Sequence, residues 1–343
     1  MADDGISVAM TTYNGARFLA EQLDSLARQE LLPRELHVGD DGSSDATLEI
    51  LADFARNAPF PVYVRRNPDN LGYGENFIQT ALRCSSRWVA FCDQDDVWLP
   101  GKLARCEHAI DAGPADLRLV AHDVIVADEN LCPRSPFYGY PPRGPLPRLT
   151  LDPEWFCLGF SQVFDKRLLT DVPPSPRLDI GWHREKQSHD VWIALLANAT
   201  GSVTLMDEPL AYYRSHGGNV TLSDVKPGLR ERIGAALESH GALYEARARH
   251  LRSMAGLLRQ KAAASAPDLG ALLEDAATRI GDQSDRLAAR AAVHRAPRLS
   301  DRFDAYLGLR RGGAYSRSGN WRFGTAAAIK DLLYALSPLP ERP

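Results

Sequence analysis

Three carboxylates follow one short apolar segment of this chain. Residues 88–92 have the composition of a buried strand, and Asp93, Asp95 and Asp96 come directly after them. Carboxylates in a core are unfavourable unless a cation or hydrogen-bond donors neutralise them. Their oxygen atoms suit Mg²⁺ or Mn²⁺, which proteins commonly hold through one or two carboxylates and the phosphates of a substrate. The alternative is that Asp95 and Asp96 cap the following helix.

Strand and helix patterns alternate in the first part of the chain. Apolar segments at 6–10, 35–39 and 62–64 are each followed by a turn-rich segment and then by apolar residues at helical spacing. Three such units predict an α/β fold with a mainly parallel sheet, right-handed crossovers and flanking helices. Ligands of such sheets collect at the carboxyl ends of the strands. The acidic residues lie at those ends.

The composition changes near residue 225. Residues 1–225 carry a net charge of −12, whereas residues 226–343 carry +8 and are rich in Ala, Leu and Arg. Leucines at helical spacing, interrupted at Pro267, predict a helical hairpin. We therefore expect a catalytic domain at 1–225 and a helical C-terminal extension at 226–343. This extension packs on the domain, forms a homodimer, or contacts an acceptor or a membrane surface.

The composition of the 343 residues, 44% hydrophobic and 24% charged, is that of a soluble globular protein. No apolar run is long enough to cross a bilayer, and residues 1–5 lack the features of a signal peptide. This predicts a cytoplasmic location, with peripheral contact with the inner face of the membrane left open. Five cysteines without Cys-x-x-Cys spacing indicate neither a disulfide framework nor a zinc site. We expect no nucleic-acid partner.

Six motifs together resemble those of the inverting family-2 glycosyltransferases with a GT-A fold, in particular bacterial rhamnosyltransferase-like members. They lie at residues 7–15, 40–45, 70–72, 93–96, 189–192 and 213–219. The resemblance covers residues 5–220. It implies a Rossmann-like GT-A domain that transfers a sugar from a UDP- or dTDP-linked donor to an acceptor hydroxyl. The acceptor classes are a glycan, a lipid-linked intermediate and a small natural product.

The resemblance also implies roles in binding the nucleotide. Asp41 accepts a hydrogen bond from the base and Tyr13 offers a stacking face, while Asp93 reaches the ribose or the waters of the metal. The nucleotide-binding residues implied in this way are Thr11, Tyr13, Asp41, Asn70, Gly72 and Asp93. For Tyr13 alone, a place in the core is the ordinary alternative.

Breaking the sugar–phosphate bond develops charge on a diphosphate, which a divalent cation stabilises. By the family pattern Asp95 is the direct metal ligand and His216 approaches the metal or the diphosphate. Arg214 would pair with phosphate through two hydrogen bonds. Asp96 either contacts the metal ligands without binding the metal itself or caps a helix.

An inverting transfer needs a base on the face opposite the leaving group. Asp190 matches the base of the family and opens a predicted helix, whose amino terminus would keep the carboxylate ionised. The alternative is that Ser188 or Asp190 caps this helix.

The segment that would line the acceptor cleft differs from the family pattern. The resemblance places Gly159, Ser161 and Gln162 there, in a segment at 155–164 that reads as a strand, and Trp155 and Trp182 are candidate stacking platforms for a sugar ring. The chain departs here from the Gly-Cys-Thr-Met pattern common in rhamnosyltransferases, so the acceptor and the sugar stay open.

Two other functions stay open at this point. A sugar nucleotidyltransferase also handles nucleotide sugars with carboxylate-bound Mg²⁺, but its first loop would be glycine-rich and basic, whereas residues 11–15 contain one Gly and no Lys. A non-catalytic protein that binds nucleotide sugars would have little use for a base at Asp190.

Overall fold

The computed structural model divides the chain into two compact units, each with a core of its own. The first unit comprises residues 1–148 and 155–223, and the second comprises 149–154 and 224–343. The described residues are 5–136, 143–155, 157–172, 188–217, 240–316 and 320–336.

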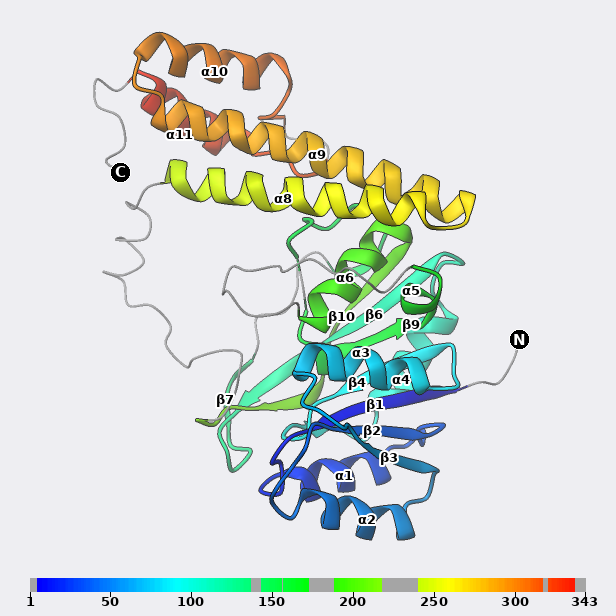
Figure 1. Ribbon diagram of the computed structural model, residues 1–343. Helices are drawn as coiled ribbons and strands as arrows, with labels where there is room; N and C mark the ends of the chain where they lie inside the picture. The colour runs from blue at the N-terminus through cyan, green and yellow to red at the C-terminus, as the bar shows by residue number, and fades with distance from the viewer. Residues whose placement is uncertain are drawn as a thin grey trace. The chain divides into compact units, whose positions relative to one another are not determined.

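A mixed sheet forms the centre of the first unit, with ten strands in its described residues (Figure 1). The strand order is β3-β2-β1-β4-β9-β6-β10-β5, with β7 paired to β6 and β8 paired to β10. The strands are β1 (Ile6–Thr12), β2 (Leu36–Asp40), β3 (Val62–Arg66), β4 (Trp88–Cys92), β5 (Val97–Trp98), β6 (Leu117–Ala127), β7 (Pro133–Pro136), β8 (Gly144–Leu146), β9 (Gln162–Asp165) and β10 (Ser202–Arg214). The helices are α1 (Leu19–Ala27), α2 (Thr47–Asn57), α3 (Tyr73–Arg83), α4 (Lys102–Asp111), η1 (Gly159–Ser161), α5 (Arg167–Thr170) and α6 (His189–Thr200).

Four neighbouring strands, β3, β2, β1 and β4, run parallel. Thr12 of β1 pairs with Asp40 of β2, and Met10 of β1 pairs with Cys92 of β4, so these three strands end at one edge of the sheet. The predicted α/β fold with flanking helices is confirmed. The polar loops that follow the strands emerge together at this edge.

The other half of the sheet corrects the expectation of a mainly parallel arrangement. Strand β9 lies antiparallel between β4 and β6, and β5, β7 and β8 also pair antiparallel with their neighbours. A parallel neighbour needs a long crossover, usually through a helix. In the described residues between β8 and β9, the single turn η1 is the helical element. The predicted strand at 155–164 is therefore correct only for its last residues.

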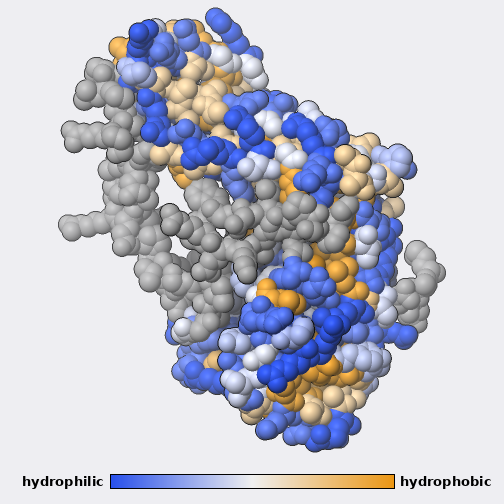
Figure 2. All heavy atoms as spheres, viewed as in Figure 1, coloured by the Kyte–Doolittle hydropathy of each residue, from blue (hydrophilic) through white to orange (hydrophobic). Residues whose placement is uncertain are grey.

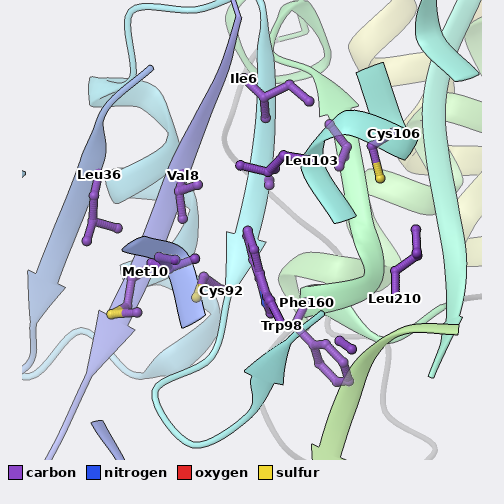
Figure 3. Close-up of a cluster of buried hydrophobic side chains, with 14 of the residues drawn as sticks. Ile6, Val8, Met10, Leu36, Cys92, Trp98, Leu103, Cys106, Phe160 and Leu210 are labelled. Atoms are coloured by element: carbon purple, nitrogen blue, oxygen red, sulfur yellow. The ribbon is translucent and has the colours of Figure 1, made fainter. Parts of the chain in front are cut away.

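Apolar side chains from the parallel strands form the first core (Figure 3). Val8 and Met10 of β1 are fully buried, as expected for a central strand of a parallel sheet. Helix α1 buries Leu19, Leu23 and Leu26, which share one helical face. Each fully buried leucine contributes about 1.5–3 kcal/mol, so this packing fixes where the strand ends lie.

The second unit is helical in its described residues, with α8 (His240–Ala263), α9 (Pro267–Arg295), α10 (Leu299–Arg311) and α11 (Gly324–Ala335). Pro267 lies in the first turn of α9. Backbone N–H groups in the first turn have no acceptor within the helix, so the missing N–H of proline costs no hydrogen bond there. Helices α8 and α9 pack against each other, and Ser284 Oγ of α9 donates to Ala248 O of α8 (2.7 Å). The predicted helical C-terminal region is confirmed. Within the described residues, no helix combines the length and the hydrophobicity that crossing a membrane requires.

One buried carboxylate links α9 to α11 in the second core. Asp331 accepts hydrogen bonds from Arg290 Nε (2.8 Å) and Tyr315 Oη (2.8 Å), and its Oδ1 lies 3.0 Å from His294 Nε2. Burial alone would raise the pKa of Asp331, but the hydrogen bonds from His294, Arg290 and Tyr315 hold this pKa below its ordinary value.

We expect Asp331→Asn to lower the free energy of unfolding by about 3–5 kcal/mol, because it leaves a buried guanidinium without its counter-charge. Urea denaturation followed by circular dichroism measures this change. Asp285→Asn is the matched control, since it breaks an ion pair whose Asp285 and Arg252 side chains are 76% and 64% exposed. Its expected effect is below about 1 kcal/mol. Equal effects of the two substitutions would contradict the prediction.

Candidate active site

The loops after β1, β2 and β4 line a cavity of about 440 Å³ at the edge where these strands end. Nine of the predicted site residues line it: Thr11, Tyr13, Asp41, Asn70, Gly72, Asp93, Asp95, Gly159 and Asp190. The fold therefore brings together residues that are up to 179 positions apart in the sequence.

A fixed carboxylate and an open aromatic ring lie on one side of this cavity. Asp41 is 4% exposed, and its Oδ1 accepts hydrogen bonds from Asn67 Nδ2 (2.7 Å) and Leu71 N (3.2 Å). Asn67 Nδ2 also donates to Asn76 Oδ1 (2.9 Å). Tyr13 is 54% exposed, which leaves its ring accessible to a ligand. This arrangement suits a planar heterocyclic base.

Asn70 and Gly72 lie in the loop before α3, which contacts the segment that carries this carboxylate. Asn70 Nδ2 donates to Asp41 O (3.1 Å), and Gly72 N donates to Asn70 Oδ1 (3.0 Å). Gly72 has φ +78° immediately before α3, a backbone conformation that favours glycine. Asn70 thus helps to hold Asp41 in place, and Gly72 orients the amide of Asn70.

Gln94 fastens the loop after β1 to the carboxylate turn after β4. Its Oε1 accepts a hydrogen bond from Tyr13 N (2.9 Å), and its Nε2 donates to Tyr13 O (3.2 Å). A Cβ atom at Gly15 would lie 2.2 Å from Gln94 Oε1, so the close approach requires glycine. Sequence reasoning missed Gln94 because it is uncharged, although its place between two candidate ligands was an available signal.

The carboxylate turn is partly buried, with Asp96 1% exposed, and its charges repel one another. Burial, together with the charges of Asp95 and Asp190, raises the pKa of Asp93 to about 8. Burial and the neighbouring carboxylates raise the pKa of Asp96 well above its ordinary value, and its Oδ1 accepts a hydrogen bond from Arg214 N (3.0 Å). Asp96 caps no helix, since α4 begins six residues later. A cation at this turn would relieve the repulsion.

The side chains of Asp95 and His216 are in contact and partly exposed. His216 Nε2 is 3.0 Å from Asp95 Oδ2, and its ring packs against Phe18 at a centroid distance of 4.8 Å. In the described ranges, no cluster of three or more His, Cys, Asp or Glu side chains is arranged to hold a metal. Mg²⁺ and Mn²⁺ complete their coordination with substrate phosphates and water. The donors present fit a cation that is shared with a diphosphate.

Arg214 does not line the cavity, and its side chain is directed into the protein. Its Nε donates to Asp95 O (2.7 Å), its Nη1 to Glu129 O (2.5 Å) and its Nη2 to Glu21 Oε2 (2.5 Å). The guanidinium also packs over the ring of Phe18 at 4.5 Å. These contacts oppose the predicted role of Arg214 as a ligand of the diphosphate, because its donors already have acceptors in the protein.

Asp190 lies in the first turn of α6 and faces the cavity. Its Oδ1 accepts a hydrogen bond from Val191 N (2.8 Å) and contacts Ser188 Oγ. Ser188 makes no side-chain cap to the helix, so the alternative of a Ser188 cap is wrong. Burial raises the pKa of Asp190 to about 7, against the opposing effect of backbone N–H groups. A carboxyl with this pKa can accept a proton near neutral pH.

Two of the predicted acceptor residues lie behind the cavity wall. Ser161 and Gln162 are fully buried. Ser161 Oγ donates to Leu158 O (2.7 Å), while Gln162 Nε2 donates to Cys157 O (2.9 Å) and to Asp190 O (3.2 Å). Their polar groups therefore hold η1 and the start of α6, which corrects their prediction as acceptor contacts.

Gly159 is the predicted acceptor residue that lines the cavity. Trp155 is half-buried and does not line it, and Trp182 lies outside the described residues. A Cβ atom at Gly159 would lie 2.5 Å from His189 Nε2, so glycine allows the two segments to meet.

An aromatic wall that sequence reasoning missed completes the cavity. His189 stacks on Phe77 at a centroid distance of 4.0 Å, and its ring edge faces Tyr73 at 6.1 Å. All three residues line the cavity. The signal for His189 was its position directly before Asp190.

A sheet whose strand ends gather a base slot, a carboxylate turn and a buried carboxyl defines an α/β domain of the GT-A type. The sequence profile of glycosyl transferase family 2 matches residues 7–172. This part of the chain is similar to the family, as its motifs predict.

Relatives of the chain match part of its length. An uncharacterized protein of Mycobacterium tuberculosis is 27% identical over 219 residues, which are 63% of this chain and 60% of the relative. An uncharacterized glycosyltransferase of Nostoc sp. is 27% identical over 230 residues, 64% of this chain and 67% of the relative. The dTDP-rhamnosyl transferase RfbG of Shigella flexneri is 31% identical over 106 residues, 30% of this chain and 36% of the relative. The chain thus spans about 60% of the mycobacterial relative.

Solved structures of similar fold include S. aureus TarS 1–349, with a TM-score of 0.53 and 18% identity over 97% of this chain and 81% of that chain. The complex of TarS 1–349 with UDP-GlcNAc has a TM-score of 0.54 and 17% identity over 97% and 82% of the two chains. At these identities the similarity concerns the fold alone.

We expect Asp190→Asn to stabilise the protein more at pH 8 than at pH 5. The folded-state pKa of Asp190, about 7, lies above the value of about 3.9 in an unfolded chain. The folded protein therefore keeps a proton that the unfolded chain releases, and wild-type stability falls as the pH rises through this interval. Asparagine is neutral throughout, so the advantage should grow by on the order of 2 kcal/mol.

Urea denaturation of both proteins at pH 5 and pH 8, without divalent cations, measures this difference. A difference in unfolding free energy that is the same at both pH values would show that the carboxyl of Asp190 does not titrate in this interval.

Proposed function

We propose that the protein is a metal-dependent inverting glycosyltransferase that uses a UDP- or dTDP-linked sugar. The observation that carries this proposal is the lining of one cavity by three groups of different function. Asp41 and Tyr13 suit a nucleotide base, Asp93 and Asp95 suit a cation and ribose, and Asp190 suits a proton acceptor.

The nucleotide slot accounts for donor binding. Asp41 is held by two hydrogen bonds and would accept one from a ring N–H group of uracil or thymine. Tyr13 would stack on the same base. The names of similar proteins include both nucleotides, since TarS was solved with UDP-GlcNAc and RfbG is a dTDP-rhamnosyl transferase.

The diphosphate would lie beside the carboxylate turn. When bound at Asp95 and His216, Mg²⁺ or Mn²⁺ would neutralise the charge that develops on the diphosphate. Asp93 would contact the ribose or the waters of this ion. Gln94 keeps the turn and the base slot at a fixed separation through its two bonds to Tyr13.

Asp190 is the proposed general base. The acceptor oxygen forms a bond to the anomeric carbon as the bond from that carbon to the phosphate oxygen breaks. The acceptor proton passes to Asp190, and the bonding electron pair leaves with the diphosphate. Attack on the face opposite the leaving group inverts the configuration. Burial places the pKa of Asp190 at about 7, so a large share of molecules hold it ionised at neutral pH.

Two alternatives have less support. A sugar nucleotidyltransferase needs a basic, glycine-rich first loop, which residues 11–15 do not provide. A protein that only binds nucleotide sugars has no need for a buried carboxyl with a pKa near 7. A thermal-shift screen of nucleotides and nucleotide sugars, followed by a donor-hydrolysis assay, separates them. A glycan, a lipid-linked intermediate and a small natural product remain the candidate acceptor classes.

We expect Asp95→Ala and Asp190→Asn both to abolish transfer, whereas only Asp95→Ala weakens metal-dependent nucleotide binding. Calorimetric titration with UDP and with dTDP, with and without Mn²⁺, measures binding. Asp53→Asn is the control, since its carboxylate is 72% exposed on α2 and should leave both properties unchanged. Unchanged Mn²⁺-dependent binding in Asp95→Ala refutes the metal assignment, and full turnover in Asp190→Asn refutes the base.

The helical unit has a separate proposed role as a homodimer contact. Helix α11 buries Asp331, whereas Ile329 and Leu333 on the same helix are 59% and 67% exposed. Figure 2 shows apolar side chains among hydrophilic ones on the visible face of this unit. Exposed apolar side chains on one face of a helix favour contact of that face with another protein surface. Here the face is the one that carries Ile329 and Leu333.

We expect sedimentation equilibrium to show a dimer at micromolar concentration that Ile329→Glu with Leu333→Glu converts to a monomer. Wild-type protein that is monomeric would refute the dimer. Flotation of such a monomer with anionic phospholipid vesicles, lost in the same double variant, would assign the face to a membrane surface instead.

A further inference from the structure

We propose that Arg214 is a positioning residue that sets the places of Asp95 and His216, and thereby the affinity of the site for its divalent cation. This inference rests on the proposed function, because it concerns the same cation site. It differs from the role in the family-based prediction, in which Arg214 contacts the diphosphate.

The contacts of Arg214 join three segments that are distant in the sequence. Its Nε donates to Asp95 O on the carboxylate turn (2.7 Å), its Nη1 to Glu129 O after β6 (2.5 Å) and its Nη2 to Glu21 Oε2 on α1 (2.5 Å). Its backbone N donates to Asp96 Oδ1 (3.0 Å). The carboxylate turn is thus held twice by this one residue, through a main-chain oxygen and through a side chain.

The same residue also determines where His216 lies. Arg214 is the last residue of β10, and His216 follows two positions later. Ser215 N donates to Ala127 O (2.9 Å), which fixes the chain between them. The ring of Phe18 contacts both the guanidinium (4.5 Å) and the imidazole of His216 (4.8 Å). Both members of the Asp95–His216 pair are therefore attached to Arg214.

A guanidinium is required for this arrangement. Its donors diverge in a fixed plane, so one side chain reaches acceptors on three segments at once. The Arg214 side chain is 2% exposed, and its loss would remove a donor from the main-chain oxygens of Asp95 and Glu129. A lysine ammonium is a single point donor and cannot span the same acceptors. Groups that orient metal ligands in this way typically change metal affinity or activity by about 10- to 100-fold when removed.

Arg17 provides a matched control, because it also contacts Phe18 and Glu129. Its guanidinium packs over the same Phe18 ring at 4.7 Å, and its Nη2 pairs with the carboxylate of Glu129 at 2.8 Å. Its side chain is 66% exposed. Among the described residues it contacts Phe18 and Glu129 rather than the turn at 93–96. Removal of Arg17 therefore tests the loss of an arginine beside Phe18 without loss of the proposed support.

The test compares wild type, Arg214→Ala, Arg214→Lys and Arg17→Ala. Mn²⁺ affinity is measured by electron paramagnetic resonance in the presence of UDP or dTDP, whichever wild type binds. Affinity for the same nucleotide without metal is measured by calorimetry. We expect Arg214→Ala and Arg214→Lys to weaken Mn²⁺ binding about 10- to 100-fold, with metal-free nucleotide affinity within twofold of wild type. Arg17→Ala should leave both affinities within twofold. Guanidinium ion at millimolar concentration should restore part of the Mn²⁺ affinity of Arg214→Ala.

The outcomes distinguish failure of the proposed function from failure of the positioning role of Arg214. Wild type that binds neither nucleotide with Mn²⁺ refutes the proposed function, and the inference with it. Mn²⁺ affinity in both Arg214 variants within twofold of wild type refutes the inference alone. A loss of metal-free nucleotide affinity equal to the loss of Mn²⁺ affinity refutes it in favour of a diphosphate contact. If Arg214→Ala does not fold, Arg214→Lys decides between these outcomes, because it retains the charge and most of the volume.

Discussion

Mutual repulsion among buried carboxylates is the constraint on which the candidate site depends. Asp93, Asp95 and Asp190 come from two separate segments, and the parallel strands and α6 bring them to one cavity. Burial, together with the charges of Asp95 and Asp190, raises the pKa of Asp93. Hydrophobic packing beneath the strands must outweigh this repulsion in the absence of a cation. A cation and an anionic ligand that bound here would therefore stabilise the protein together.

The architecture around this constraint was predictable from the sequence because it follows from local patterns. Apolar segments followed by polar turns and amphipathic helices specify parallel strands, and parallel strands place their following loops at one edge. Thr11 lies near the end of β1, and Asp41 and Asp93 directly follow β2 and β4, so their meeting in one cavity required only the strand order. The antiparallel pairings of β5, β7, β8 and β9 were not predictable in this way, because such short strands carry no signal of their direction.

Three of the predicted site residues have side chains that are directed into the protein, and they have a common physical feature. Arg214, Ser161 and Gln162 carry polar groups that satisfy main-chain oxygens, and such acceptors are invisible in a sequence. Motif similarity places these residues near a ligand but does not say which way their side chains point. Gln94 and His189 were missed for the converse reason. Their importance comes from contacts across the fold, with Tyr13 and Phe77, rather than from charge.

Lys102 and Arg214, two buried basic side chains near the turn, direct donors to main-chain oxygens. Lys102 is fully buried, and its Nζ donates to Phe160 O (2.6 Å) and lies 3.3 Å from the centroid of Trp98. Burial lowers the pKa of Lys102 to about 7. Arg214 likewise directs Nε to the main-chain oxygen of Asp95. Lys102 thus supports η1, and Arg214 supports the backbone of the turn. Asp93 and Asp95 line the cavity, so a cation that arrived with a ligand would meet their carboxylates there.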